Sequence, residues 1–194
     1  MSHPILQFFG KPDVVDLAGL RAYLDGLDHP GRLEAIAQLG GREQARLFEA
    51  AQGFKPLTLD DFVPTGTATL TEVIHYGRNT LPAFNNFQKR FCRPEGRTDE
   101  LWGYNEQSMA WAVGPGYFIT RQSDPQEVVI DYRDVPPGKI ESWPSIKPNS
   151  AGLSRLVYDK MQDFMRGVSS HVSIGRAQKK GKNMDAWFVL SRDR

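Results

Sequence analysis

The chain has very few residues that could form disulfides or a metal site. Among its 194 residues there is one cysteine, Cys92, and there are four histidines, at positions 3, 29, 75 and 171. One cysteine excludes an internal disulfide framework and a multi-cysteine zinc or iron–sulfur site. The histidines form no His-Glu-x-x-His pair, so the sequence predicts no metal site. We expect Cys92 to be a small buried hydrophobe rather than a nucleophile, since strand alternation would turn Arg93 to the other face.

A strong overall charge and a long apolar run are also lacking. The 24 basic and 23 acidic residues give a formal net charge of +1, so no global field attracts nucleic acid or acidic lipid. Apolar runs are far shorter than the roughly 20 residues needed to cross a bilayer. The first residues have neither the basic start nor the apolar stretch of a secretory signal. We therefore expect a cytoplasmic protein that binds neither nucleic acid nor a membrane.

The common phosphate-binding and nucleophile motifs are missing. The sequence has no Gly-x-Ser-x-Gly and no Gly-x-Gly-x-x-Gly following a strand. The segment 175–183 looks like a phosphate-binding loop, but it has five residues between its glycines instead of four and joins two expected strands. Its lysines are better explained as the solvated tip of a hairpin. The sequence thus identifies no cofactor.

The composition is that of an ordinary globular chain, with 40% hydrophobic and 24% charged residues. The length suits one domain with its own core. Residues 1–64 are predicted to be a helical segment of that domain. One stripe of leucines recurs at helical spacing, and the following two helices are expected to end at glycines. The stripe consists of Leu17, Leu20, Leu24 and Leu27.

Residues 65–194 are predicted to form an antiparallel β-rich core. From Thr67 the apolar residues alternate with a period of two, and turn signals follow at intervals of about ten residues. This spacing is typical of a meander, and we expect six to eight strands in a barrel-like or strongly curved sheet. The last two strands, 170–177 and 184–190, are expected to form a hairpin.

One further helix is predicted over about 151–167, before that hairpin. Its apolar residues recur at helical spacing and would form one face that covers an open side or end of the sheet. The predicted fold class is therefore α+β. The residues of this face are Leu153, Leu156, Val157, Met161, Phe164, Met165 and Val168.

Isolated polar residues among apolar neighbours suggest a binding pocket. In a barrel, alternate residues of each strand point inward, and inward polar groups need partners or a ligand. The chain also has 11 Phe, 4 Trp and 6 Tyr. We therefore expect a small, largely apolar ligand in or against the sheet. The candidate ligand-binding residues are Tyr76, Trp102, Tyr104, Asn105, Tyr132, His171 and Arg176.

Two alternatives come from other classes of function. An enzyme in the same pocket could use His75, Glu106 or Asp131 for acid–base chemistry, because burial raises the pKa of a carboxyl group. A protein–protein interaction module could use the acidic segment 1–64, with a net charge of −3, and the basic segment 166–194, with a net charge of +5. Whether the protein is an enzyme is left open, and the sequence allows a homo-oligomer without indicating one.

Overall fold

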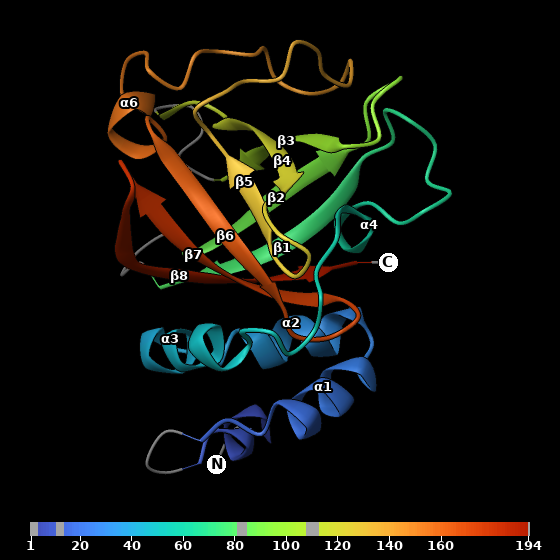
Figure 1. Ribbon diagram of the computed structural model, residues 1–194, viewed down its shortest axis with the longest axis vertical. Coiled ribbons are helices and arrows are strands. Elements are labelled where there is room, and N and C mark those ends of the chain that lie inside the picture. The colour runs from blue at the N-terminus through green and yellow to red at the C-terminus, as the bar shows by residue number, and fades with distance from the viewer. Residues whose placement is uncertain (1–3, 11–13, 81–84, 108–112, 194) are drawn as a thin grey trace.

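The computed structural model describes residues 4–10, 14–80, 85–107 and 113–193. Short helices come first, and an eight-stranded antiparallel barrel follows (Figure 1). The helices are η1 (Pro4–Phe8), α1 (Leu17–Asp25), α2 (His29–Ile36), α3 (Gly41–Ala50), α4 (Leu59–Phe62) and α6 (Ser154–Val157). The strands are β1 (Val73–Asn79), β2 (Asn86–Cys92), β3 (Glu100–Glu106), β4 (Tyr117–Gln122), β5 (Val128–Asp131), β6 (Met161–Gly167), β7 (Val172–Lys179) and β8 (Lys182–Arg192). The predicted α+β class with a barrel-like sheet is confirmed.

Each strand pairs with the next along the chain, and β1 pairs with β8 to close the barrel. The closing register runs from His75 opposite Arg192 to Asn79 opposite Phe188. Closure satisfies the backbone groups that an open sheet would leave at its edges. The last strand, apolar on both faces, thereby lies between two neighbours.

Side-chain alternation fills the barrel interior. Inward residues of six strands form one core cluster, which includes Phe91, Leu101, Phe118, Ile130, Met165 and Leu190. Glycines on the wall make room for the largest rings. A Cβ on Gly103 would lie 2.3 Å from the Phe118 ring, and one on Gly175 would lie 2.4 Å from the Phe188 ring. Part of the interior is thus packed tightly and excludes a ligand.

The N-terminal helices form a layer outside the barrel (Figure 1). Helices α2 and α3 pack on β8, and α3 also packs on β7. The contact joins helix residues such as Ile36 and Leu47 to the outer-face residues Ile174 and Val189. Helix caps fix where these elements begin: the side chain of Asp16 accepts from the Gly19 amide, and that of Asp28 from the Gly31 amide, each at 2.9 Å.

The two ends of the barrel differ. The segment 55–63, with α4, covers the end at which β2, β4, β6 and β8 finish; we call this the closed end. Its Leu57, Phe62 and Val63 belong to the core cluster and are at most 2% exposed. The Gln122 amide donates to the Leu57 carbonyl oxygen at 2.8 Å, which ties the segment to β4. The opposite end, at which β1, β3, β5 and β7 finish, we call the mouth.

The prediction of a helix over 151–167 is wrong. The chain forms only the single turn α6 (Ser154–Val157) and then the strand β6, which pairs with β5 and β7. Leu153 and Leu156 are exposed, at 53% and 69%, instead of lying on a buried helix face. Pairing on both sides of β6 outweighs a local helical pattern because it supplies the ladder that the barrel needs to close.

Candidate functional site

A cavity of about 310 Å³ opens at the mouth of the barrel. Strand termini and α6 supply its wall, and α6 lies on the opposite side of the barrel from α4 (Figure 1). Most of the surface is apolar, which is typical of sites for small molecules. The large side chains that line it are Phe87, Tyr132, Leu156, Val157, Tyr158, Met161, Met184, Trp187 and Phe188.

Four polar side chains meet inside this cavity and form one hydrogen-bonded cluster, the Lys89 network. The Lys89 ammonium donates to Asp163 Oδ2 at 3.0 Å, to Asn105 Oδ1 at 3.0 Å and to the Tyr132 hydroxyl oxygen. The Asn105 amide donates to the Tyr132 oxygen at 3.0 Å. The Tyr132 hydroxyl lies 3.2 Å from Asp163 Oδ2 and donates there. All four residues are buried.

Strand alternation explains how these groups reach the interior. Lys89 lies between Phe87 and Phe91 on the inward face of β2, and Asn105 and Asp163 lie on the inward faces of β3 and β6. Tyr132 follows directly after β5. Four different parts of the sheet thus contribute one group each, and a closed barrel is what brings them together.

The ammonium of Lys89 is enclosed by aromatic rings. Its Nζ lies 4.9 Å from the ring centre of Phe188, 5.0 Å from that of Tyr132, 5.3 Å from that of Phe118 and 5.5 Å from that of Phe87. Ring faces attract a cation, and the attraction grows where water is excluded. The rings and the Asp163 carboxylate together replace part of the hydration that burial removes.

Burial shifts the acidity of the network. It lowers the pKa of Lys89, while the charge of Asp163 and the hydrogen bond to it act in the opposite direction. Burial also raises the pKa of Tyr132 well above its usual range, and the nearby Asp163 charge adds to that rise. The phenol therefore stays neutral, and the polar contacts of the network centre on the Lys89–Asp163 pair.

The closed end holds a buried histidine of different character. The Nε2 atom of His75 lies 2.9 Å from the Phe62 carbonyl oxygen, and the ring stacks on Phe62 and meets the edge of Phe91. Burial lowers the pKa of His75 to about 3, an effect larger than the opposing hydrogen bond to Phe62. His75 is therefore a neutral ring in the core at neutral pH.

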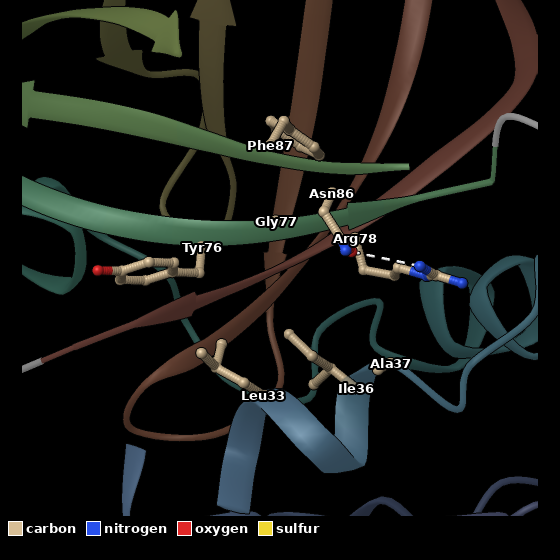
Figure 2. Close-up of a pocket in the computed structure, with 8 residues that line it drawn as sticks. All are labelled: Leu33, Ile36, Ala37, Tyr76, Gly77, Arg78, Asn86 and Phe87. Atoms are coloured by element: carbon tan, nitrogen blue, oxygen red, sulfur yellow. Dashed lines mark hydrogen bonds between the residues drawn. The ribbon is translucent and has the colours of Figure 1, made fainter. Parts of the chain in front are cut away.

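A second hollow, of about 260 Å³, lies outside the barrel between α2 and the strands β1 and β2. Figure 2 shows Leu33 and Ile36 extending from α2 toward β1, where Tyr76 and Arg78 lie on the side of the helix. The Arg78 guanidinium donates to Asn85 Oδ1 at 2.7 Å and to Asn86 Oδ1 at 3.2 Å. This hollow separates two packed layers, and the described residues that line it include no comparable cluster of buried polar groups.

Two of the seven predicted ligand-binding residues, Asn105 and Tyr132, line the cavity at the mouth. Tyr76 lines the hollow between α2 and the barrel instead. Trp102 and Tyr104 lie on the outer face of β3, in a cluster with Tyr117 and Trp143. Tyr76, Trp102 and Tyr104 therefore lie on the outer side of the barrel wall, away from the Lys89 network.

The other two predicted ligand-binding residues also lie outside the mouth. His171 lies at the closed end, where burial is the largest of the effects that lower its pKa. The Arg176 guanidinium lies over the Trp187 ring at 5.2 Å and 3.6 Å from Glu49, between the barrel and α3.

The three residues proposed for acid–base chemistry do not share a pocket. His75 is at the closed end, and Glu106 follows Asn105 on the outward side of β3, where it accepts from the Tyr104 hydroxyl at 3.3 Å. Asp131 forms a paired contact with Arg133, the shortest distance being 2.6 Å. No acid–base pair is assembled from them.

Sequence reasoning missed Lys89 and Asp163. A signal existed for Lys89, because the alternation Phe87, Lys89, Phe91 puts the lysine on the apolar face of a strand. Asp163 was missed because the predicted helix placed it outside the buried apolar face. Cys92, by contrast, is buried as expected, and burial raises its pKa to about 12, so its thiol is unreactive.

Among the residues described here, no group of three or more His, Cys, Asp or Glu side chains is placed to hold a metal ion. The described helices include none with the length and apolar character needed to cross a membrane. Comparison with protein-family models, with curated proteins and with solved structures found no match to this chain.

Proposed function

We propose that the protein binds a small, largely apolar molecule in the mouth of the barrel. The observation that carries this proposal is the combination of an aromatic-lined cavity with a buried polar network inside it. Binding sites for small molecules commonly pair an apolar wall with a few fixed polar groups, the wall supplying affinity and the polar groups orientation.

The cavity volume sets the size of the ligand. An apolar cavity of about 150 Å³ is enough to hold one benzene molecule. The mouth, at about 310 Å³, has room for roughly ten to twelve non-hydrogen atoms. Aromatic side chains on several sides favour a flat or aromatic ligand, since rings pack edge to face or offset at short distances.

The Lys89 network also favours ligand binding over the alternative of acid–base catalysis. His75, Glu106 and Asp131 lie away from the cavity, and Lys89 and Asp163 neutralise each other in a salt bridge at 3.0 Å. A general acid or base must come within hydrogen-bond reach of the reacting proton.

Naphthalene is a suitable first probe because it is apolar, aromatic and of the right size. We expect it to bind wild-type protein, as measured by equilibrium dialysis. The variant Ala177→Phe adds a ring to the cavity wall and should weaken binding at least tenfold, whereas Ala18→Phe, on the exposed side of α1, should leave it unchanged. Equal binding by wild type and Ala177→Phe, or no binding by wild type, would contradict the proposal.

A further inference from the structure

One oxygen atom of the Lys89 network has no hydrogen-bond partner among the described residues. It is Asp163 Oδ1, whereas the other oxygen of the same carboxylate accepts from Lys89 and Tyr132. The Asp163 side chain is only 3% exposed. Buried carboxylate oxygens are almost always hydrogen-bonded, because a desolvated acceptor without a donor is costly.

The donors of the network are already engaged. The three hydrogens of the Lys89 ammonium point to Asp163, Asn105 and Tyr132. The Asn105 amide donates to the Tyr132 oxygen at 3.0 Å. At the edge of the cavity, the Gln107 amide donates to the Tyr158 hydroxyl oxygen at 2.6 Å. The Asn105 amide also hydrogen-bonds the Tyr158 side chain. Asp163 lines the cavity, so what the network offers to a ligand is an acceptor.

The charge of the network points the same way. Lys89 and Asp163 carry opposite charges and cancel. A carboxylate ligand placed beside them would add an uncompensated negative charge in an apolar cavity and would face the Asp163 carboxylate. A neutral ligand avoids both costs.

We infer that the ligand is a neutral molecule with a hydroxyl or N–H group, which donates a hydrogen bond to Asp163 Oδ1 while its apolar body fills the mouth. This inference rests on the proposed function and adds the chemical class of the ligand. The cavity then selects alcohols, phenols or amides over hydrocarbons of the same shape and over carboxylates. A hydrogen bond to a charged acceptor away from water is stronger than one between neutral groups.

Three naphthalenes with different substituents at the same carbon test this inference in the wild-type protein. 2-Naphthol carries the donor, 2-methylnaphthalene replaces the hydroxyl with a methyl group of similar size, and 2-naphthoate carries a negative charge. Near neutral pH we expect 2-naphthol to bind at least tenfold more tightly than either of the others, as measured by equilibrium dialysis. The methyl compound is the more hydrophobic of the two neutral ligands, so burial alone would favour it.

The possible outcomes distinguish a failure of this inference from a failure of the proposed function. Binding of 2-methylnaphthalene with an affinity equal to or above that of 2-naphthol would overturn the inference and leave the apolar site standing. Tightest binding of 2-naphthoate would also overturn it, and would point to Lys179 at the edge of the cavity as the anchor. Failure of all three ligands to bind would overturn the proposed function as well.

A double variant locates the preference in the network. Lys89→Met together with Asp163→Leu replaces the buried ion pair with apolar side chains, a change that proteins often tolerate. We expect this variant to bind 2-methylnaphthalene but to lose the tenfold preference for 2-naphthol. Lys147→Met, on an exposed loop, serves as the matched control and should keep it. A preference that persists in the double variant would show that the donor is bound elsewhere.

Discussion

The two ends of the barrel bury ionisable groups in different ways. At the mouth, Lys89 lies 3.0 Å from the carboxylate of Asp163, whose charge and hydrogen bond oppose the lowering of the Lys89 pKa by burial. At the closed end, His75 has an aromatic stack and one backbone carbonyl as partners, and it is kept neutral. The difference teaches that burial lowers the pKa of a basic group at both ends of this barrel, while the group that opposes the shift differs: a carboxylate in direct contact at the mouth and a backbone carbonyl at the closed end.

The largest expected effect comes from breaking the pair at the mouth. Lys89→Met or Asp163→Leu alone should lower the free energy of unfolding by about 3–5 kcal/mol, because each leaves one buried charge without its partner. The double variant should recover most of that loss. Urea unfolding of the wild type, both single variants and the double variant measures the coupling between the two residues.

An ion pair on the outside of the same barrel provides the control. Arg176 on β7 pairs with Asp185 on β8 at 3.6 Å, and the Asp185 side chain is 91% exposed. Asp185→Asn should therefore cost less than about 1 kcal/mol. If the losses of unfolding free energy from the Lys89 and Asp163 substitutions simply add in the double variant, the two residues are not coupled. The contrast between the paired group at the mouth and His75 at the closed end would then be wrong.

An intermediate effect is expected at the closed end on acidification. The pKa of His75 is about 3 in the folded protein and 6.5 in the unfolded chain. Above pH 6.5 both states are neutral; as the pH falls toward 3, the unfolded chain takes up a proton that the folded protein does not, so stability is lost. At pH 4.5 this contribution is about 3 kcal/mol.

His75→Gln removes this titration while keeping a donor for the Phe62 carbonyl. Unfolding free energies at pH 7 and 4.5 should therefore differ less in the variant than in the wild type, by about 3 kcal/mol. His171→Gln is the matched control: the pKa of His171 is also lowered, but the residue is only partly buried, so the change should be smaller. An unchanged pH dependence in His75→Gln would mean that the ring is protonated in the core.

The smallest effect on stability is expected from the covering turn at the mouth. Leu156 in α6 is 69% exposed, unlike the fully packed side chains of the closed end. Leu156→Ser should change the free energy of unfolding by no more than about 0.5 kcal/mol. It should weaken naphthalene binding, because Leu156 lines the cavity. A large loss of stability would indicate that α6 is part of the core instead of a cover.

The barrel could be predicted from the period-two alternation of apolar residues and from the closely spaced turns, because both patterns involve residues that are near each other in the chain. It misplaced β6 because Met161 and Met165 are four residues apart, a spacing that puts them on one face of a helix and also on one face of a strand. What distinguishes the strand from a helix is the pairing of β6 with β5 and β7. Strand pairing cannot be seen in a local sequence pattern.

The residues that line the cavity could be predicted in part for the same reason. Asn105 and Tyr132 line it as expected from their place in the sheet, whereas Asp163 was missed together with the misplaced β6. Glu106 and Asp131 are adjacent to inward residues in the chain, and a shift of one position exchanges the two faces of a strand. The pairing of Lys89 with Asp163 joins residues 74 positions apart, which no spacing in the sequence specifies.

The order of synthesis has a consequence for the docking of the N-terminal helices. Helices α1 to α3 are made before β7 and β8, the strands that form the outer surface on which α2 and α3 pack. Until β8 leaves the ribosome, the apolar faces of these helices have no surface to cover and β1 has no closing neighbour. Chaperone capture during translation should therefore concentrate on the N-terminal helices, and release should coincide with closure of the ring.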